Sequence, residues 1–150
     1  MYNRVALFVS MILTLLMLQG CTNNVKTKTF KGQIAGVNVT HVFTYEGDRV
    51  LTTSTTQIMQ YSTLKVSTKS DAQQILQPVT TKFRNLQGID YKIMFFDTNC
   101  EESIYIDYSK AKINDINIVM PLTSTGGSTD YVSMSATEAN LRKLGLLVVN

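Results

Sequence analysis

The chain has 150 residues and a formal net charge of +3, and its basic residues are dispersed among acidic ones. This dispersal argues against a nucleic-acid partner, which would require a basic patch or stripe. The chain has only two cysteines, Cys21 and Cys100, and one histidine, His41. A histidine-rich metal site is therefore excluded, and modification of either cysteine would also exclude a disulfide within the chain.

The first 20 residues are typical of a lipoprotein signal peptide. Arg4 precedes an apolar core from Val5 to Leu18, and Gln19-Gly20 leads into Cys21. This core is shorter than the roughly 20 residues of a membrane-spanning helix, so we expect a cleaved signal. We predict cleavage between Gly20 and Cys21 and lipidation of the Cys21 thiol, with two or three acyl chains such as palmitate holding the protein on the membrane. The alternatives are an ordinary secretory signal with an incidental cysteine, or an uncleaved anchor.

The rest of the chain predicts one domain on a short tether. Residues 21–29 are polar apart from Cys21 and Val25, which indicates a flexible linker. Residues 30–150 are enough for a single α+β domain that needs no disulfide. In a Gram-negative cell, Thr22 after the cysteine favours the periplasmic face of the outer membrane. In a Gram-positive cell, we expect the outer face of the plasma membrane.

Period-two patterns predict an antiparallel sheet of five to six hairpin-connected strands with two helices on one face. The first half should contain strands at 30–34, 37–46 and 50–61, with Glu46-Gly47-Asp48 as a turn. A helix should begin near Thr68-Lys69-Ser70-Asp71 and end at Gly88. Pro78 lies inside this segment, so we expect a kink near residues 74–77 or two short helices.

The second half returns to strands. Residues 89–96 and 103–108 form the most apolar hairpin, which we place at the centre of the sheet. Residues 112–122 fit either a helix or a strand, and 123–129 read as a loop. Ser135-Ala-Thr-Glu138 resembles a capping box that opens a helix ending at Gly145, and 146–149 reads as a last strand.

The sequence contains no recognisable catalytic centre, and we expect no enzyme activity, cofactor or metal. His41 falls on the apolar face of a strand, which favours a hydrogen-bonded core histidine over a catalytic one. The stretch Asp97-x-Asn99-x-Glu101 imitates a calcium loop but lacks its later glycine and glutamate. A hydrolase-type carboxylate pair could be drawn from Asp97, Glu101, Glu102 and Asp107, although a solvated turn explains them more simply. Gly126-Gly127 lacks the context of a phosphate-binding loop.

Cys100 lies between two predicted strands in a polar stretch. An exposed thiol there could form an intermolecular disulfide or be redox-active. The simpler interpretation is a small residue in a turn, since Glu101 and Glu102 disfavour a reactive thiolate.

Three segments behind the predicted lipidation site resemble the YehR-like family of small bacterial lipoproteins. They are Phe43-Thr-Tyr-Glu-Gly-Asp-Arg-Val-Leu51, Thr68-Lys-Ser-Asp-Ala72 with Leu76-Gln-Pro78, and Ile104-Tyr-Ile-Asp-Tyr108. The resemblance covers most of residues 30–110 and is weak from Ile113 to Val132. It implies an envelope lipoprotein with an α+β domain, no assigned activity and no catalytic residues.

Two functions remain open from the sequence. The first is a membrane-anchored, non-catalytic adaptor that binds another envelope protein, because anchoring raises the effective concentration toward partners on the same surface. The second is a carrier or sensor of a small apolar ligand, with unknown ligand-binding residues. An enclosed cavity would favour the carrier, and a filled interior beside an exposed apolar patch would favour the adaptor.

Overall fold

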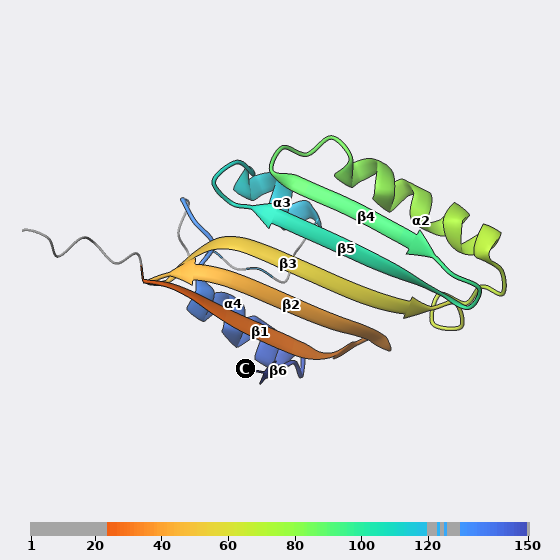
Figure 1. Ribbon diagram of the computed structural model, residues 1–150, viewed down its shortest axis with the longest axis horizontal. Helices are drawn as coiled ribbons and strands as arrows, with labels where there is room; N and C mark the ends of the chain where they lie inside the picture. The colour runs from red at the N-terminus through yellow and green to blue at the C-terminus, as the bar shows by residue number, and fades with distance from the viewer. Residues whose placement is uncertain (1–23, 120–122, 124, 126–129, 150) are drawn as a thin grey trace, which may run out of the picture.

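The computed structural model describes residues 24–119, 123, 125 and 130–149, and these form a six-stranded antiparallel sheet with helices (Figure 1). The elements are β1 (Val25–Ile34), β2 (Val37–Glu46), β3 (Arg49–Gln60), α2 (Lys69–Phe83), β4 (Ile89–Phe95), β5 (Asn99–Asp107), α3 (Ile113–Val119), α4 (Met134–Lys143) and β6 (Leu147–Val149). The strand order is β4-β5-β3-β2-β1-β6. The α+β fold class is confirmed, with three helices in the described residues where two were expected.

All three helices pack against the same face of the sheet. Three apolar clusters lie between the sheet and the helices. One joins β1 and β2 to α4 through Phe30, Phe43 and Leu141. The others lie beneath α2 and α3, and include Ile116 and Leu76. The opposite face of the sheet carries no helix among the described residues, and we call it the open face.

Helix α2 begins as predicted and then continues through its proline. The Thr68 hydroxyl accepts a hydrogen bond from the Asp71 amide at 3.1 Å and caps the helix. The helix is unbroken from Lys69 to Phe83, so the expected split into two short helices is wrong. Pro78 is exposed, where water can hydrogen-bond the carbonyl group that a proline leaves free.

Two other expectations about the sheet are wrong. Residues 25–29 belong to β1 and pair with β2, so any tether ends before Val25. The β4–β5 hairpin also lies at one side, with β4 as an edge strand, while β3 and β2 form the centre. The apolar side chains of the hairpin are needed for packing under α2 and α3 instead. Residues 113–119, for which the sequence fits either a helix or a strand, form helix α3. The predicted last strand is confirmed as β6.

A polar strip crosses the buried face between the apolar clusters. His41 is 1% exposed, and its Nδ1 lies 2.8 Å from the Thr55 hydroxyl on the neighbouring strand. Thr53 and Glu102 are buried on the same face. His41 Nε2 has no hydrogen-bond partner among the described residues. Burial lowers the pKa of His41 to about 4 and raises the pKa of Glu102. The prediction of a hydrogen-bonded core histidine is confirmed.

The turn between β2 and β3 holds the start of α4. Ser133 is the N-cap, and its hydroxyl accepts from the Ala136 amide at 3.1 Å. The same hydroxyl donates to the Asp48 carboxylate at 2.6 Å, and the Ser135 amide donates to that carboxylate at 2.8 Å. These hydrogen bonds lower the pKa of Asp48. The predicted capping box is therefore wrong, because Ser133 caps the helix and Glu138 pairs with Lys28 at 2.6 Å.

Replacing the cap should destabilise the domain. Ser133→Ala removes the cap of α4 and one of the hydrogen bonds to the β2–β3 turn, so we expect a loss of about 1–2 kcal/mol in the free energy of unfolding. Urea denaturation at pH 7 measures this loss. Ser135→Ala is the matched control, because its backbone amide still donates to Asp48 and the loss should be smaller. Equal stability of Ser133→Ala and the wild type would contradict the assignment.

The buried histidine should make the domain sensitive to acid. The pKa of His41 is lower in the folded state than the usual 6.5, so the unfolded state binds more protons below that pH. We expect the free energy of unfolding to fall by about 2 kcal/mol from this residue between pH 6.5 and 5. The raised pKa of Glu102 acts in the opposite direction, since protonation of that group favours the folded state.

Comparing the wild type with His41→Gln by urea denaturation across this pH range isolates the histidine, because Glu102 is present in both proteins. We expect a shallower loss of stability toward pH 5 in His41→Gln. Parallel pH profiles for the two proteins would show that His41 does not titrate as described.

Candidate functional site

The open face of the sheet is a regular array of short side chains. Strand pairing places its residues in rows across β5, β3, β2 and β1. The rows read Asp107-Thr52-Thr44-Thr27, Tyr105-Ser54-Val42-Thr29, Ser103-Thr56-Thr40-Lys31 and Glu101-Ile58-Asn38-Gln33. Six threonines and two serines therefore occupy half of these positions. Their hydroxyls also bond across strands, since the Thr44 and Thr52 oxygens lie 2.6 Å apart.

The centre of this open face carries no charge. On β2 and β3 its residues are Asn38, Thr40, Val42, Thr44, Thr52, Ser54, Thr56 and Ile58. Charged residues such as Lys31 and Glu101 lie on the flanking strands β1 and β5. Large apolar side chains are exposed around the centre, with Ile58 39%, Tyr105 42% and Leu147 67% exposed. Depletion of charge with exposed apolar side chains is the composition found at the core of protein interfaces.

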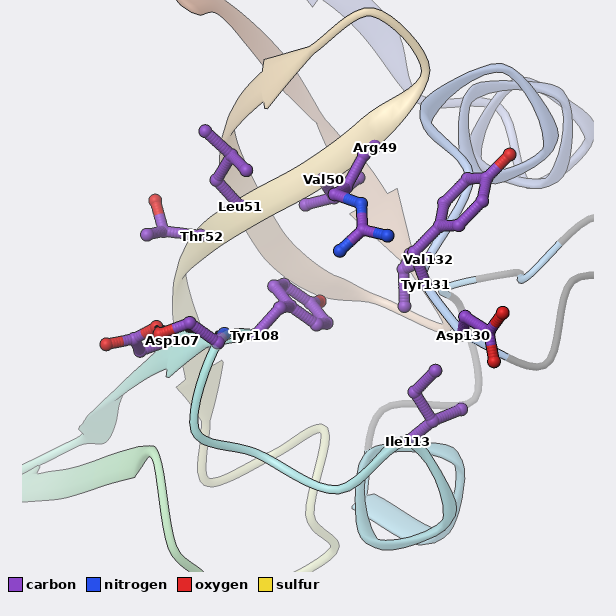
Figure 2. Close-up of a pocket in the computed structure, with 11 residues that line it drawn as sticks. Arg49, Val50, Leu51, Thr52, Asp107, Tyr108, Ile113, Asp130, Tyr131 and Val132 are labelled. Carbon is purple, nitrogen blue, oxygen red and sulfur yellow. Dashed lines mark hydrogen bonds between the residues drawn. The ribbon is translucent and has the colours of Figure 1, made fainter.

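A pocket of about 230 Å³ lies at the end of the sheet where β3 begins and β5 ends (Figure 2). Val50 and Val132 form part of its wall and are linked by a backbone hydrogen bond of 2.9 Å. Ile113, at the start of α3, lies across from them. Exposed Arg49 and Asp130 also line the pocket, so it is open to solvent.

Arg49 is the cation of this pocket. Its guanidinium lies over the Tyr131 ring, with the guanidinium carbon 5.2 Å from the ring centre. Figure 2 shows the guanidinium pointing into the pocket above Tyr108. None of the ion pairs found in the described residues includes Arg49. No short motif links Arg49 to Tyr131, which lies 82 positions further along the chain, so this contact could not be predicted from the sequence.

Asp107 lines the same pocket, but its carboxylate forms an ion pair with Lys110. Its carboxylate pairs with Lys110 at 2.7 Å and accepts the hydroxyl and amide hydrogens of Ser109. These contacts lower the pKa of Asp107 to about 2. In Figure 2 the carboxylate points away from the pocket. Of the charged side chains drawn in Figure 2, the Arg49 guanidinium is the one that points into the pocket.

The carboxylates that the sequence suggested as a pair lie apart in the structure. Neighbouring residues of a strand point to opposite faces, so Glu102 is buried under the helices while Glu101 lies on the open face. Asp107 lies at the far end of β5 from Glu101. Glu101, Glu102 and Asp107 therefore lie apart and do not form a carboxylate pair. No cluster of three metal-ligating side chains occurs among the described residues.

Cys100 is not an exposed turn residue. It belongs to β5, and its side chain is fully buried in the cluster beneath α2. Burial raises the pKa of its thiol, with the nearby Glu102 adding to the shift. Both expectations for Cys100, the exposed intermolecular thiol and the turn residue, are therefore wrong.

The predicted leader and lipidation site, including Gly20 and Cys21, lie outside the described residues, as do most of the predicted loop 123–129 and Gly126-Gly127. Within the described part of the chain, no helix is long and apolar enough to cross a membrane.

Known proteins resemble this chain in sequence. Residues 26–147 match a family described as "Protein of unknown function (DUF1307)". The uncharacterised lipoprotein Lmo0207 of Listeria monocytogenes is 30% identical over 129 residues, which are 86% of this chain and 84% of that protein. The uncharacterised lipoprotein YehR of Escherichia coli K12 is 31% identical over 93 residues, or 62% of this chain and 61% of that protein.

Solved structures share the fold. The NMR structure of Escherichia coli YehR matches with a TM-score of 0.73 and 24% identity, covering 85% of this chain and 93% of that one. An NMR structure of a protein from Streptococcus pneumoniae TIGR4 matches with a TM-score of 0.55 and 14% identity, covering 87% and 88%. The chain therefore belongs to the DUF1307 family, and its expected kinship with YehR-like envelope lipoproteins is confirmed.

Proposed function

We propose that this lipoprotein is a non-catalytic adaptor whose open sheet face binds another protein confined to the same membrane surface. The observation that carries the proposal is the uncharged centre of that face. Removing threonine and serine hydroxyls from water costs far less free energy than removing charges, provided that they find hydrogen-bond partners. Exposed Ile58 and Tyr105 beside these hydroxyls would supply the apolar area that such an interface needs.

Lipidation of Cys21 would place this face beside neighbouring membrane proteins. The first strand begins at Val25, four residues beyond the predicted anchor. An extended chain spans at most about 3.3–3.6 Å per residue, so Val25 would lie within about 14 Å of Cys21. Such a short link keeps the domain close to the membrane, where it meets partners on the same surface at high effective concentration.

The interior of the described residues does not favour the alternative, a carrier of a small apolar ligand. Aromatic side chains pack closely against one another in the apolar clusters under the helices. Phe30 packs edge-on against Phe43 with ring centres 5.9 Å apart, and Phe83 stacks on Tyr91 at 4.7 Å. The pocket at the β3–β5 end is open to solvent, and the charged residues Arg49, Asp107 and Asp130 are among those that line it. The adaptor is therefore the better supported of the two hypotheses.

Site-specific crosslinking in intact cells tests the adaptor. A photoreactive amino acid at Ser54, which is exposed at the centre of the open face, should give a discrete protein adduct. The matched control places the same group at exposed Ser70 on α2, on the other side of the domain. We expect the Ser54 adduct to weaken strongly in Cys21→Ala and to disappear when Thr56→Arg adds a charge to the face. Equal adducts from both positions, or none from Ser54, would contradict the proposal.

Mass spectrometry of the protein made in its own host tests the anchor. We expect a mature chain that begins at Cys21 and carries two or three acyl chains, and an unprocessed chain for Cys21→Ala. An unmodified amino terminus in the wild type would contradict the predicted lipid anchor at Cys21.

A further inference from the structure

We propose that the outer edge of β4, together with the groove beside it, binds an extended segment of another protein as an added strand of the sheet. Figure 1 shows β4 at the outer side of the sheet with α2 beside it. A sheet edge offers its backbone groups to an added strand, and some domains bind extended peptides in this way. The site is separate from the centre of the open face, so this proposal goes beyond the adaptor function.

The backbone of β4 has hydrogen-bonding groups that point outward. The Asp107 amide donates to the Gly88 carbonyl at 2.8 Å, which directs the backbone just before β4 toward β5. The pairing register then runs without interruption along β4. Residues of an antiparallel pair face their partner strand alternately, so the amides and carbonyls of Tyr91, Ile93 and Phe95 point away from β5. No described strand lies on that side.

A groove of about 520 Å³ lies along this edge, between β4 and α2. Half-buried Ile93 and Phe95 form its apolar side. The flank of α2 forms the other side, with Arg84 and the uncharged polar residues Ser70, Gln73, Gln74, Gln77, Thr80 and Thr81. Glutamine amides both donate and accept hydrogen bonds, so this flank suits the polar groups of an extended chain. Side chains of an added strand that point to the covered face would enter this groove.

Stacking holds α2 beside the edge. Phe83 at the end of the helix stacks on Tyr91, with ring centres 4.7 Å apart and 14° between the ring planes. At the other end of β4, Phe95 packs against the cluster that contains Leu76 of α2. The groove is therefore formed before a ligand arrives, which lowers the cost of binding.

Asp90 and Lys92 determine which segment fits. Both are exposed and point to the open face, since they pair with Tyr105 and Ser103. Charged side chains on an edge strand oppose indiscriminate pairing. Side chains directly opposite one another in an antiparallel pair lie close together, so opposite charges there are favourable and like charges unfavourable. The segment should therefore carry an acid opposite Lys92 and, two residues further along, a base opposite Asp90.

A second copy of this chain fits the edge less well, given the predicted anchor. Two β4 strands paired antiparallel would run in opposite directions. The Val25 ends of the two copies would then lie at opposite ends of the joined sheet, so only one copy could stand with that end on the membrane. We therefore assign the edge to a segment of a different protein.

NMR titration of the mature protein in detergent with a synthetic peptide tests the site. The probe, acetyl-Val-Thr-Val-Glu-Val-Lys-Val-amide, matches β4 in length and places its glutamate opposite Lys92 and its lysine opposite Asp90. We expect saturable changes in the amide signals of Tyr91, Ile93 and Phe95. A control peptide with the glutamate and lysine exchanged should bind about fivefold more weakly. Absence of these changes with the probe, or equal binding of the two peptides, would overturn the proposal.

Methylation of single peptide nitrogens tests the added strand itself. The third residue of the probe lies opposite Ile93, so its amide points at β4, and methylation there should weaken binding about tenfold. The fourth residue lies opposite Lys92 and its amide points away from β4. Methylation of that nitrogen is the matched control and should leave binding unchanged. Equal losses from the two modifications would show that the peptide does not pair with the strand.

A double variant should reverse the preference between the peptides. Asp90→Lys combined with Lys92→Glu exchanges the two charges, so this protein should bind the control peptide better than the probe. Lys31→Glu changes an exposed lysine on β1 and should keep the wild-type preference. Circular dichroism checks that the variants are folded. An unchanged preference in the double variant would contradict the register.

Sedimentation without peptide tests the alternative occupant. We expect a single chain in each detergent particle, and a dimer that dissociates in Lys92→Glu would assign the edge to a second copy and overturn the proposal. The double variant should leave the Ser54 crosslink unchanged, because Ser54 lies on β3 at the centre of the open face. Failure of the edge proposal and failure of the adaptor can therefore be told apart.

Discussion

The alternation of side chains between the two faces of the sheet is the constraint on which the rest of the structure depends. A single row on the buried face, Val148-Phe30-His41-Thr55-Ile104-Tyr91, crosses all six strands. The neighbouring row on the open face is built from residues such as Thr29, Val42 and Ser54. A slip of one residue in any strand would exchange these two sets. The covered face and the open face are therefore two consequences of one register.

The buried face tolerates polar groups because it satisfies most of them within the sheet. Thr53 bonds to the Tyr108 hydroxyl at 3.0 Å, and Thr55 bonds to His41. Burial holds His41 in its neutral form near neutral pH, since an imidazolium there would lose its hydration. This strip separates the cluster under α4 from those under α2 and α3. Each helix consequently packs on its own part of the sheet.

The β2–β3 turn lies beside the start of α4, the pocket and the start of β1. Asp48 holds the start of α4, and the segment that follows Tyr131 pairs with β3 through Val132 and Ser133. This pairing brings Tyr131 beneath Arg49 and so builds the pocket. The same turn lies beside Val25, where the chain leads toward the predicted anchor. In this arrangement the end of the domain would face the membrane while the open face would face neighbouring proteins.

The sequence by itself determined the local elements, since periodicity and caps such as Thr68 depend on residues close in the chain. Only the tertiary structure decided which strands are central, that Cys100 is buried, and that Ser133 caps α4 through Asp48. It also decided the meeting of Arg49 with Tyr131. These features depend on contacts between residues distant in sequence, which strand pairing and helix packing create. The sequence predicted a sheet with helices on one face, whereas the uncharged centre of the other face followed only from which strands became neighbours.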